Sequence, residues 1–100
     1  MEFRYESALQ EYMREKGHRT ILVELVEINN SDLDISELHV RFPNARIREQ
    51  FVTKKNYRVF ETELGEVLLP RYPLEIQELV TFGLKKILFF HQITCKGIKL

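Results

Sequence analysis

Four side chains in this sequence could act as acid–base groups near neutral pH or bind a soft metal ion. They are His18, His39, His91 and Cys95. His91 and Cys95 lie four residues apart, and on a helix this spacing would place both on one face. We expect a strand here, which also puts them on one face but roughly 13 Å apart, too far to share an ion. A core cysteine near a partly exposed histidine is therefore favoured over a metal or thiol site formed by His91 and Cys95.

Oxygen ligands are close together in a second stretch, which suggests a calcium site. They are supplied by Asn30, Asp32, Asp34 and Glu37. The calcium-binding EF-hand loop needs glycine at its sixth position and glutamate at its twelfth, and here those positions are Ile35 and Arg41. A solvated loop, in which polar side chains bond neighbouring backbone groups, is the favoured interpretation.

The basic stretch 41–58 is the third candidate, with six basic residues against one acidic residue, a balance of +5. Its candidate nucleic-acid patch consists of Arg46, Arg48, Lys54, Lys55 and Arg58. The aromatic residues Phe42, Phe51 and Tyr57 could stack on bases while the cations neutralise phosphates. However, the pI of the whole chain is about 6.8, below the strongly basic value typical of nucleic-acid modules. Residues 59–82 carry a balance of −4. A solvated basic face, or one paired with this acidic complement, is therefore favoured over nucleic-acid binding.

Catalytic motifs are missing from the sequence. Its four glycines are isolated, so no glycine-rich phosphate loop exists, and it contains no Gly-x-Ser-x-Gly, His-Glu-x-x-His or paired-cysteine motif. We therefore expect no enzyme activity, no cofactor and no catalytic residue.

Length and composition indicate one globular domain covering residues 1–100, with 44% hydrophobic and 30% charged residues. A single cysteine excludes an internal disulfide and is typical of the cytoplasm. The charged first residues do not form a secretory signal, and no apolar run approaches the ~18 residues of a membrane span. We expect a cytoplasmic protein without a membrane partner.

The segment Arg19–Ile28 is predicted to be the central strand, since its apolar residues fall on both alternate faces. A helix is predicted over Phe3–Lys16, ended by Gly17 and lying across one face of that strand. His18 falls in the connection between them.

The remaining elements are predicted from periodicity and turn residues. Residues 29–37 form a polar turn, with 31–34 capping a short helical turn, and 38–42 form a strand. Residues 44–56 are irregular, with one helical turn or a surface loop as the possibilities for 46–52. A hairpin joins 57–62 to 66–69 through Gly65. Residues 74–82 form a strand ending at Gly83, with a helix as the alternative; 84–89 form a helical turn and 90–100 a final strand. The fold class is α+β, with an N-terminal helix packed on a largely antiparallel sheet of five to six strands.

Three segments together resemble a small prokaryotic family described as CC/Se-motif or HesB-like. They are Glu-Lys-Gly at 15–17 before the strand 20–28, Tyr-Arg-Val-Phe at 57–60, and the ending 84–100, about half the chain. The family carries two cysteines, or cysteine and selenocysteine, in the loop after its first strand, where this chain has Asn29-Asn30-Ser31-Asp32. The resemblance thus implies the family's fold but not its thiol, redox or iron–sulfur chemistry. Cys95 belongs to the terminal strand and does not replace the pair.

The leading functional hypothesis is a non-catalytic cytosolic binding or assembly module that acts through a protein interface and could form a homodimer. It depends on the apolar surplus in 67–69 and 87–90, which could leave an exposed patch. The alternatives are RNA binding by the basic patch, and a cysteine-depleted relative of HesB-like sulfur or iron–sulfur carriers.

Overall fold

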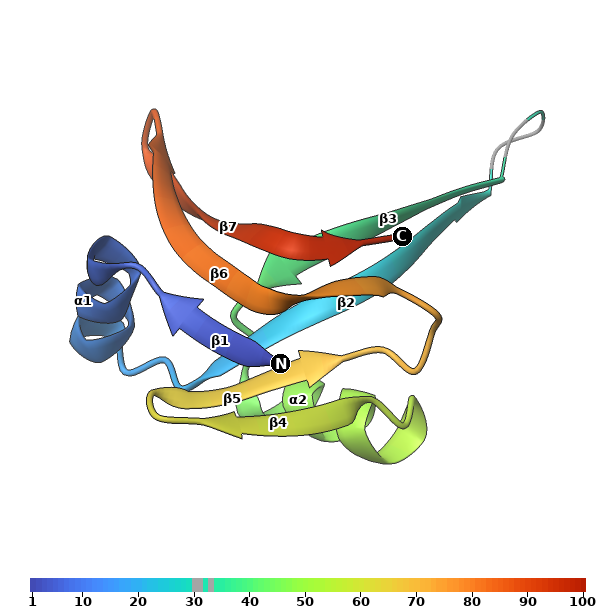
Figure 1. Ribbon diagram of the computed structural model, residues 1–100, viewed down its shortest axis with the longest axis horizontal. Coiled ribbons are helices and arrows are strands. Elements are labelled where there is room, and N and C mark those ends of the chain that lie inside the picture. The colour runs from blue at the N-terminus through green and yellow to red at the C-terminus, as the bar shows by residue number, and fades with distance from the viewer. Residues whose placement is uncertain (30–31, 33) are drawn as a thin grey trace.

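Two β-sheets stacked face to face, with helices at one end and on one outer face, make up this α+β protein (Figure 1). The computed structural model describes residues 1–29, 32 and 34–100. Its elements are β1 (Glu2–Tyr5), α1 (Ser7–Lys16), β2 (Thr20–Asn29), β3 (Asp34–Arg41), α2 (Ala45–Glu49), the π-helical turn η1 (Gln50–Lys54), β4 (Arg58–Thr62), β5 (Gly65–Leu69), β6 (Glu75–Ile87) and β7 (Phe90–Lys99). One sheet has the order β1-β6-β7 and the other β3-β2-β5-β4.

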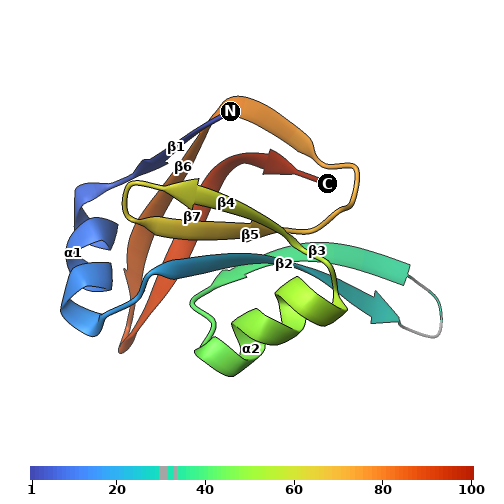
Figure 2. The ribbon, with the colours of Figure 1, turned by 90° about the horizontal axis from the view of Figure 1, so that it is seen from below.

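The first half of β2 lies in the interior, as its sequence predicts. Ile21, Leu22 and Val23 are completely buried. Ile21 and Val23 face the core between the two sheets, whereas Leu22 faces the opposite side. The second half of β2 is less buried than the first: Val26 is half-buried and Ile28 is 40% exposed. In both views the β2–β3 hairpin extends beyond the body of the molecule (Figures 1 and 2).

The prediction of an irregular segment at 44–56 is wrong: residues 45–54 are helical, which exceeds the single helical turn considered for 46–52. The Asn44 side chain accepts a hydrogen bond of 2.8 Å from the backbone N–H of Ile47, which caps the helix start. Phe51 is buried against Leu22 and Leu68, so this helical segment covers the outer face of β2 and β5. Packing on β2 and β5, whose contact residues Leu22 and Leu68 are 29 and 17 residues from Phe51 in the sequence, stabilises it.

The N-terminal helix is shorter than predicted, because residues 2–5 form β1 instead. Phe3 and Tyr5 both place their rings against Phe82, with centroids 6.1 and 5.9 Å away, and β1 pairs in parallel with β6. The predicted end of the helix is confirmed, since Gly17 adopts φ 72° and its N–H reaches Met13 O. The helix α1 closes one end of the gap between the sheets and contributes Leu9 to the shared core, rather than lying across β2 (Figures 1 and 2).

The hairpin β4–β5 is confirmed, and so are the strands predicted at 74–82 and 90–100. Three predictions are wrong. Strand β6 does not end at Gly83 but continues to Ile87, so the helical turn at 84–89 does not form. The polar turn 29–37 is too long, because Asp34–Glu37 already belong to β3. The described residues form seven strands in two sheets, not five or six in one, and two of the strand pairs are parallel.

No helix within residues 1–29, 32 and 34–100 has the length and apolar character needed to cross a membrane.

Candidate functional site

The terminal strand β7 carries both members of the proposed metal or thiol pair. His91 is exposed and lies beside Tyr12 of α1, with 4.7 Å between ring centroids, whereas Cys95 is half-buried against the core. Burial raises the pKa of the Cys95 thiol to about 11, so the thiol is protonated at neutral pH and is a poor nucleophile. Across the part of the chain that the structure describes, no three His, Cys, Asp or Glu side chains gather to hold a metal ion.

Of the other two histidines, His18 shares Tyr12 with His91, since the His18 and Tyr12 ring centroids are 6.1 Å apart, whereas His39 lies on β3. The His18 ring is parallel to that of Phe42, with centroids 4.1 Å apart. His39 makes a 2.9 Å contact with the carboxylate of Glu37 on the same strand. His39 and Cys95 line one cleft of about 710 Å³ between the edge strands β3 and β7. The sequence contains no local signal for this cleft, because its two walls are more than 50 residues apart.

The proposed calcium ligands can be placed only in part. Asn30 lies outside the described residues, as do Ser31 and Leu33 of the predicted helical turn. Asp34 begins β3, where its backbone pairs with Asn29.

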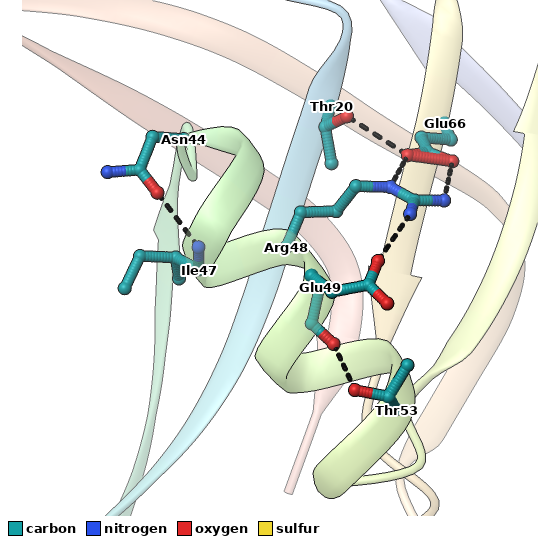
Figure 3. A network of polar contacts seen from close by, with 7 residues as sticks. All are labelled: Thr20, Asn44, Ile47, Arg48, Glu49, Thr53 and Glu66. Atoms are coloured by element: carbon teal, nitrogen blue, oxygen red, sulfur yellow. Dashed lines mark hydrogen bonds and ion pairs between the residues drawn. The ribbon is translucent and has the colours of Figure 1, made fainter.

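The candidate nucleic-acid patch is dispersed over α2, η1 and the start of β4, and some of its charge is used within the fold. Arg48 donates two hydrogen bonds to the carboxylate of Glu66 on β5, one of them 3.0 Å from Nη2 to Oε2 (Figure 3). The Thr20 hydroxyl donates a further bond of 3.1 Å to the same carboxylate. This network fastens the helical segment α2–η1 to the sheet. Arg48 and Glu66 thus join the basic block to the acidic block within the chain, which is one of the outcomes that the charge pattern leaves open.

The other patch residues remain on the surface. Arg46 and Lys54 are exposed, Lys55 lies over the Phe51 ring at 4.5 Å, and Arg58 lies over the Phe60 ring at 4.8 Å.

Two of the three aromatic residues that were expected to stack on bases are turned inward, and the third, Phe42, is half-buried and stacked on His18. Phe51 and Tyr57 are 4% and 9% exposed and pack edge to face, and the Tyr57 hydroxyl accepts a hydrogen bond from Leu25 N. Burial raises the pKa of the Tyr57 phenol. A single-strand binding surface needs accessible aromatic faces, which neither ring supplies. RNA binding by these arginines and lysines stays a prediction.

The Arg48–Glu66 contact makes a testable contribution to acid stability. Its hydrogen bonds hold the pKa of Glu66 below the usual value. The stabilisation is therefore complete above the unfolded-state pKa, near 4.5, and is lost as pH falls through the lower folded-state pKa. Glu66→Gln should lower the unfolding free energy by at most about 1 kcal/mol at pH 7, because Arg48 is about one-third exposed, and by less at pH 3. Urea unfolding of both proteins between pH 3 and 7 measures this; an equal deficit at every pH would contradict it.

The two apolar segments that were expected to leave an exposed patch, 67–69 and 87–90, differ in their exposure. Val67, Leu68 and Leu69 of β5 are at most 1% exposed and belong to the core. Leu88, Phe89 and Phe90 are 80%, 99% and 57% exposed, and we call these three residues the hairpin tip. Of the two segments, only the second supplies the exposed apolar surface that the sequence predicted.

The hairpin tip is a tight turn at one extremity of the molecule (Figures 1 and 2). Ile87 pairs with Phe90, which leaves Leu88 and Phe89 as a two-residue connection between β6 and β7. Leu88 adopts φ 53°, a left-handed conformation that glycine or asparagine usually occupies in such turns. Lys85 and Lys86 lie beside the turn on β6 and are exposed. The result is an apolar protrusion with two lysines next to it.

A hollow of about 760 Å³ lies between the other two edge strands, β1 and β4. Phe3 and Leu64 supply apolar surface to its lining, while Glu2, Glu61 and Glu63 supply carboxylates. The Tyr5 hydroxyl and Thr62 Oγ1 are 2.9 Å apart across the two strands and join the sheets there. The hollow has no counterpart among the sequence predictions, because residues 3–5 of β1 were expected to start a helix.

Comparison of the chain with models of protein families, with curated proteins and with solved structures found no match. The resemblance to the HesB-like family therefore stays a prediction based on the three sequence segments.

Proposed function

We propose that this protein is a non-catalytic cytoplasmic interaction module that contacts a protein partner through the hairpin tip. The observation that carries the proposal is the exposure of three consecutive large apolar side chains at one turn. Contiguous exposed apolar surface with a polar surround is typical of protein contact sites. Aromatic side chains are also the residues that most often contribute binding energy at such interfaces.

The conformation of Leu88 supports a functional rather than a structural reason for this sequence. A leucine with positive φ costs roughly 1–2 kcal/mol relative to the right-handed conformation, and Leu88 gains almost no burial in return. Glycine at this position would fold more easily. Backbone strain without a packing benefit is found preferentially where a surface binds another molecule.

The distribution of reactive groups supports a role without catalysis. His18 and His91 both contact the ring of Tyr12, whereas His39 contacts the carboxylate of Glu37. A catalytic base and a nucleophile must lie within hydrogen-bond reach of each other, and the described contacts of the histidines supply no such pair. The protonated, half-buried thiol of Cys95 suits a reducing compartment.

Site-specific photo-crosslinking in cells of the source organism tests the proposal. A benzoylphenylalanine at position 89 should give discrete covalent adducts with protein, identifiable by mass spectrometry. The same residue at Tyr72, which is 46% exposed and far from the tip in sequence, is the matched control. Adducts to lipid, equal adducts at both positions, or no adduct at position 89 would each overturn the proposal.

Replacement of Leu88 by glycine separates folding from binding. Leu88→Gly should raise the unfolding free energy by about 0.5–1 kcal/mol, because relief of the left-handed strain exceeds the entropy that glycine adds to the unfolded chain. The same variant should reduce the crosslinks from position 89. Leu64→Gly is the control, since Leu64 lies in the β4–β5 turn without positive φ, and it should lose about 0.5–1 kcal/mol. Urea unfolding measures both; a loss of stability in Leu88→Gly would contradict the strain argument.

A further inference from the structure

The hairpin tip is a protrusion and the region between β1 and β4 is a hollow, so the two surfaces have complementary shapes. The tip is a narrow protrusion of three apolar side chains, and the hollow falls in the 300–1,000 Å³ range of typical binding pockets. Phe3 is half-buried and Leu64 is 37% exposed, so the hollow offers apolar surface for an incoming aromatic ring. Its two walls are edge strands, whose outer backbone groups can hydrogen-bond an approaching turn.

The charges of the two surfaces are also complementary. Lys85 and Lys86 flank the tip, whereas Glu2, Glu61 and Glu63 line the hollow together with one cation, Arg4. The side chains of the lining therefore carry a balance of −2, and −1 when the amino group of Met1 is included, against +2 beside the tip. Among the described residues none of these six side chains takes part in an ion pair of the fold. Opposite charges arranged around an apolar contact steer association and fix its orientation.

A single chain cannot bring these two surfaces together. The tip lies at the far end of the β6–β7 hairpin, and both views place it well away from β1 and β4 (Figures 1 and 2). Any contact between them has to join two molecules.

We propose that the partner is a second copy of this chain, whose β1–β4 hollow receives the hairpin tip. This inference rests on the proposed function and names its partner. The contact joins two different surfaces, so it is heterologous, and repetition of it produces a closed ring or an open chain rather than a two-fold dimer. The contact is small, and affinities on the order of 10–500 µM are expected for interfaces of this class.

Charge reversal tests the pairing directly. The tip variant Lys85→Glu with Lys86→Glu and the hollow variant Glu61→Lys with Glu63→Lys should each associate at least about tenfold more weakly than the unmodified protein. An equimolar mixture of the two should associate again, because each reversed surface then meets its complement. Sedimentation velocity from 10 µM to 1 mM at low salt measures this. A mixture no more associated than either variant alone would overturn the inference.

A second pair of variants tests which surfaces meet. Phe89→Ser removes the tip and keeps the hollow, while Leu64→Glu blocks the hollow and keeps the tip. Each should be monomeric alone, and their mixture should stop at a 1:1 complex. Self-association of Leu64→Glu alone would show that two tips meet, which overturns the inference.

Failure of this inference is distinguishable from failure of the proposed function. If the unmodified protein stays monomeric at 1 mM while position 89 crosslinks to another protein, the second copy is excluded and the interaction module stands. If position 89 forms no protein adduct, both are overturned.

Discussion

Phe82→Ala should destabilise the protein more than any other truncation of an aromatic side chain. Phe82 is completely buried between the sheets, and its ring contacts those of Phe3 and Tyr5 from β1. Removal of a buried phenylalanine typically costs about 3–5 kcal/mol, from lost burial and from the cavity left behind. The total stability of a domain of this size is on the order of 5–15 kcal/mol, so the variant should be close to unfolding.

Phe89→Ala is the matched control for Phe82→Ala, since it makes the same chemical change at a side chain that is 99% exposed. It should change the unfolding free energy by less than about 0.5 kcal/mol. Thermal unfolding should then show a midpoint more than about 10 °C lower for Phe82→Ala than for Phe89→Ala. Similar midpoints for the two variants would contradict the placement of Phe82 in the core and of Phe89 on the surface.

The contrast between these two phenylalanines shows where sequence reasoning succeeds. The alternation of Val80 and Phe82 predicted a strand, and both residues are completely buried on it. The sequence indicated surplus apolar residues in both 67–69 and 87–90. Residues 67–69 belong to the interior strand β5 and are buried, whereas residues 88–90 form the tip and are exposed. Local pattern identifies apolar segments; only the tertiary pairing of strands determines which of them is covered.

The errors in the predicted fold have the same origin. Residues 2–5 are too few for a period-2 pattern to be distinguished from the start of a helix, and their pairing partner lies about 75 residues away on β6. The apolar face of the helical segment 45–54 consists only of Ile47, Phe51 and Val52, a pattern too short to fix a helix, and it is covered by contact with β2 and β5. In both cases long-range contacts outweigh local propensity.

The candidate site was predictable only in part for a related reason. The apolar residues of the tip are consecutive in the sequence, so an exposed apolar patch at this place was predictable. The hollow is formed by residues 1–5, 10 and 61–64, which come together through β1 and β4, and the positive φ of Leu88 is a backbone property. Neither leaves a local signal in the sequence.

Gly65→Ala should lower the unfolding free energy more than the addition of a methyl group at any other glycine of the chain. Gly65 adopts φ 143°, and an added Cβ would lie 1.9 Å from the carbonyl oxygen of Arg19. The obstacle is backbone rather than a flexible side chain, so β5 would have to move away from the start of β2. That movement breaks the 2.8 Å hydrogen bond from Glu66 N to Arg19 O and disturbs the parallel pairing of Ile21 with Val67. A disrupted buried hydrogen bond costs about 1–3 kcal/mol and backbone strain a similar amount, so we expect a loss of at least about 3 kcal/mol.

Gly17→Ala separates this steric effect from the cost of positive φ alone. Gly17 ends α1 with φ 72°, and an added Cβ would meet nothing within 4 Å. Its replacement should cost only about 1 kcal/mol, from the left-handed backbone. Urea unfolding of the two alanine variants measures the difference, which should be at least about 2 kcal/mol. Equal losses would mean that the start of β2 yields to the added methyl group, and the tight junction between Arg19 and Gly65 would then not be what holds β5 beside the central strand.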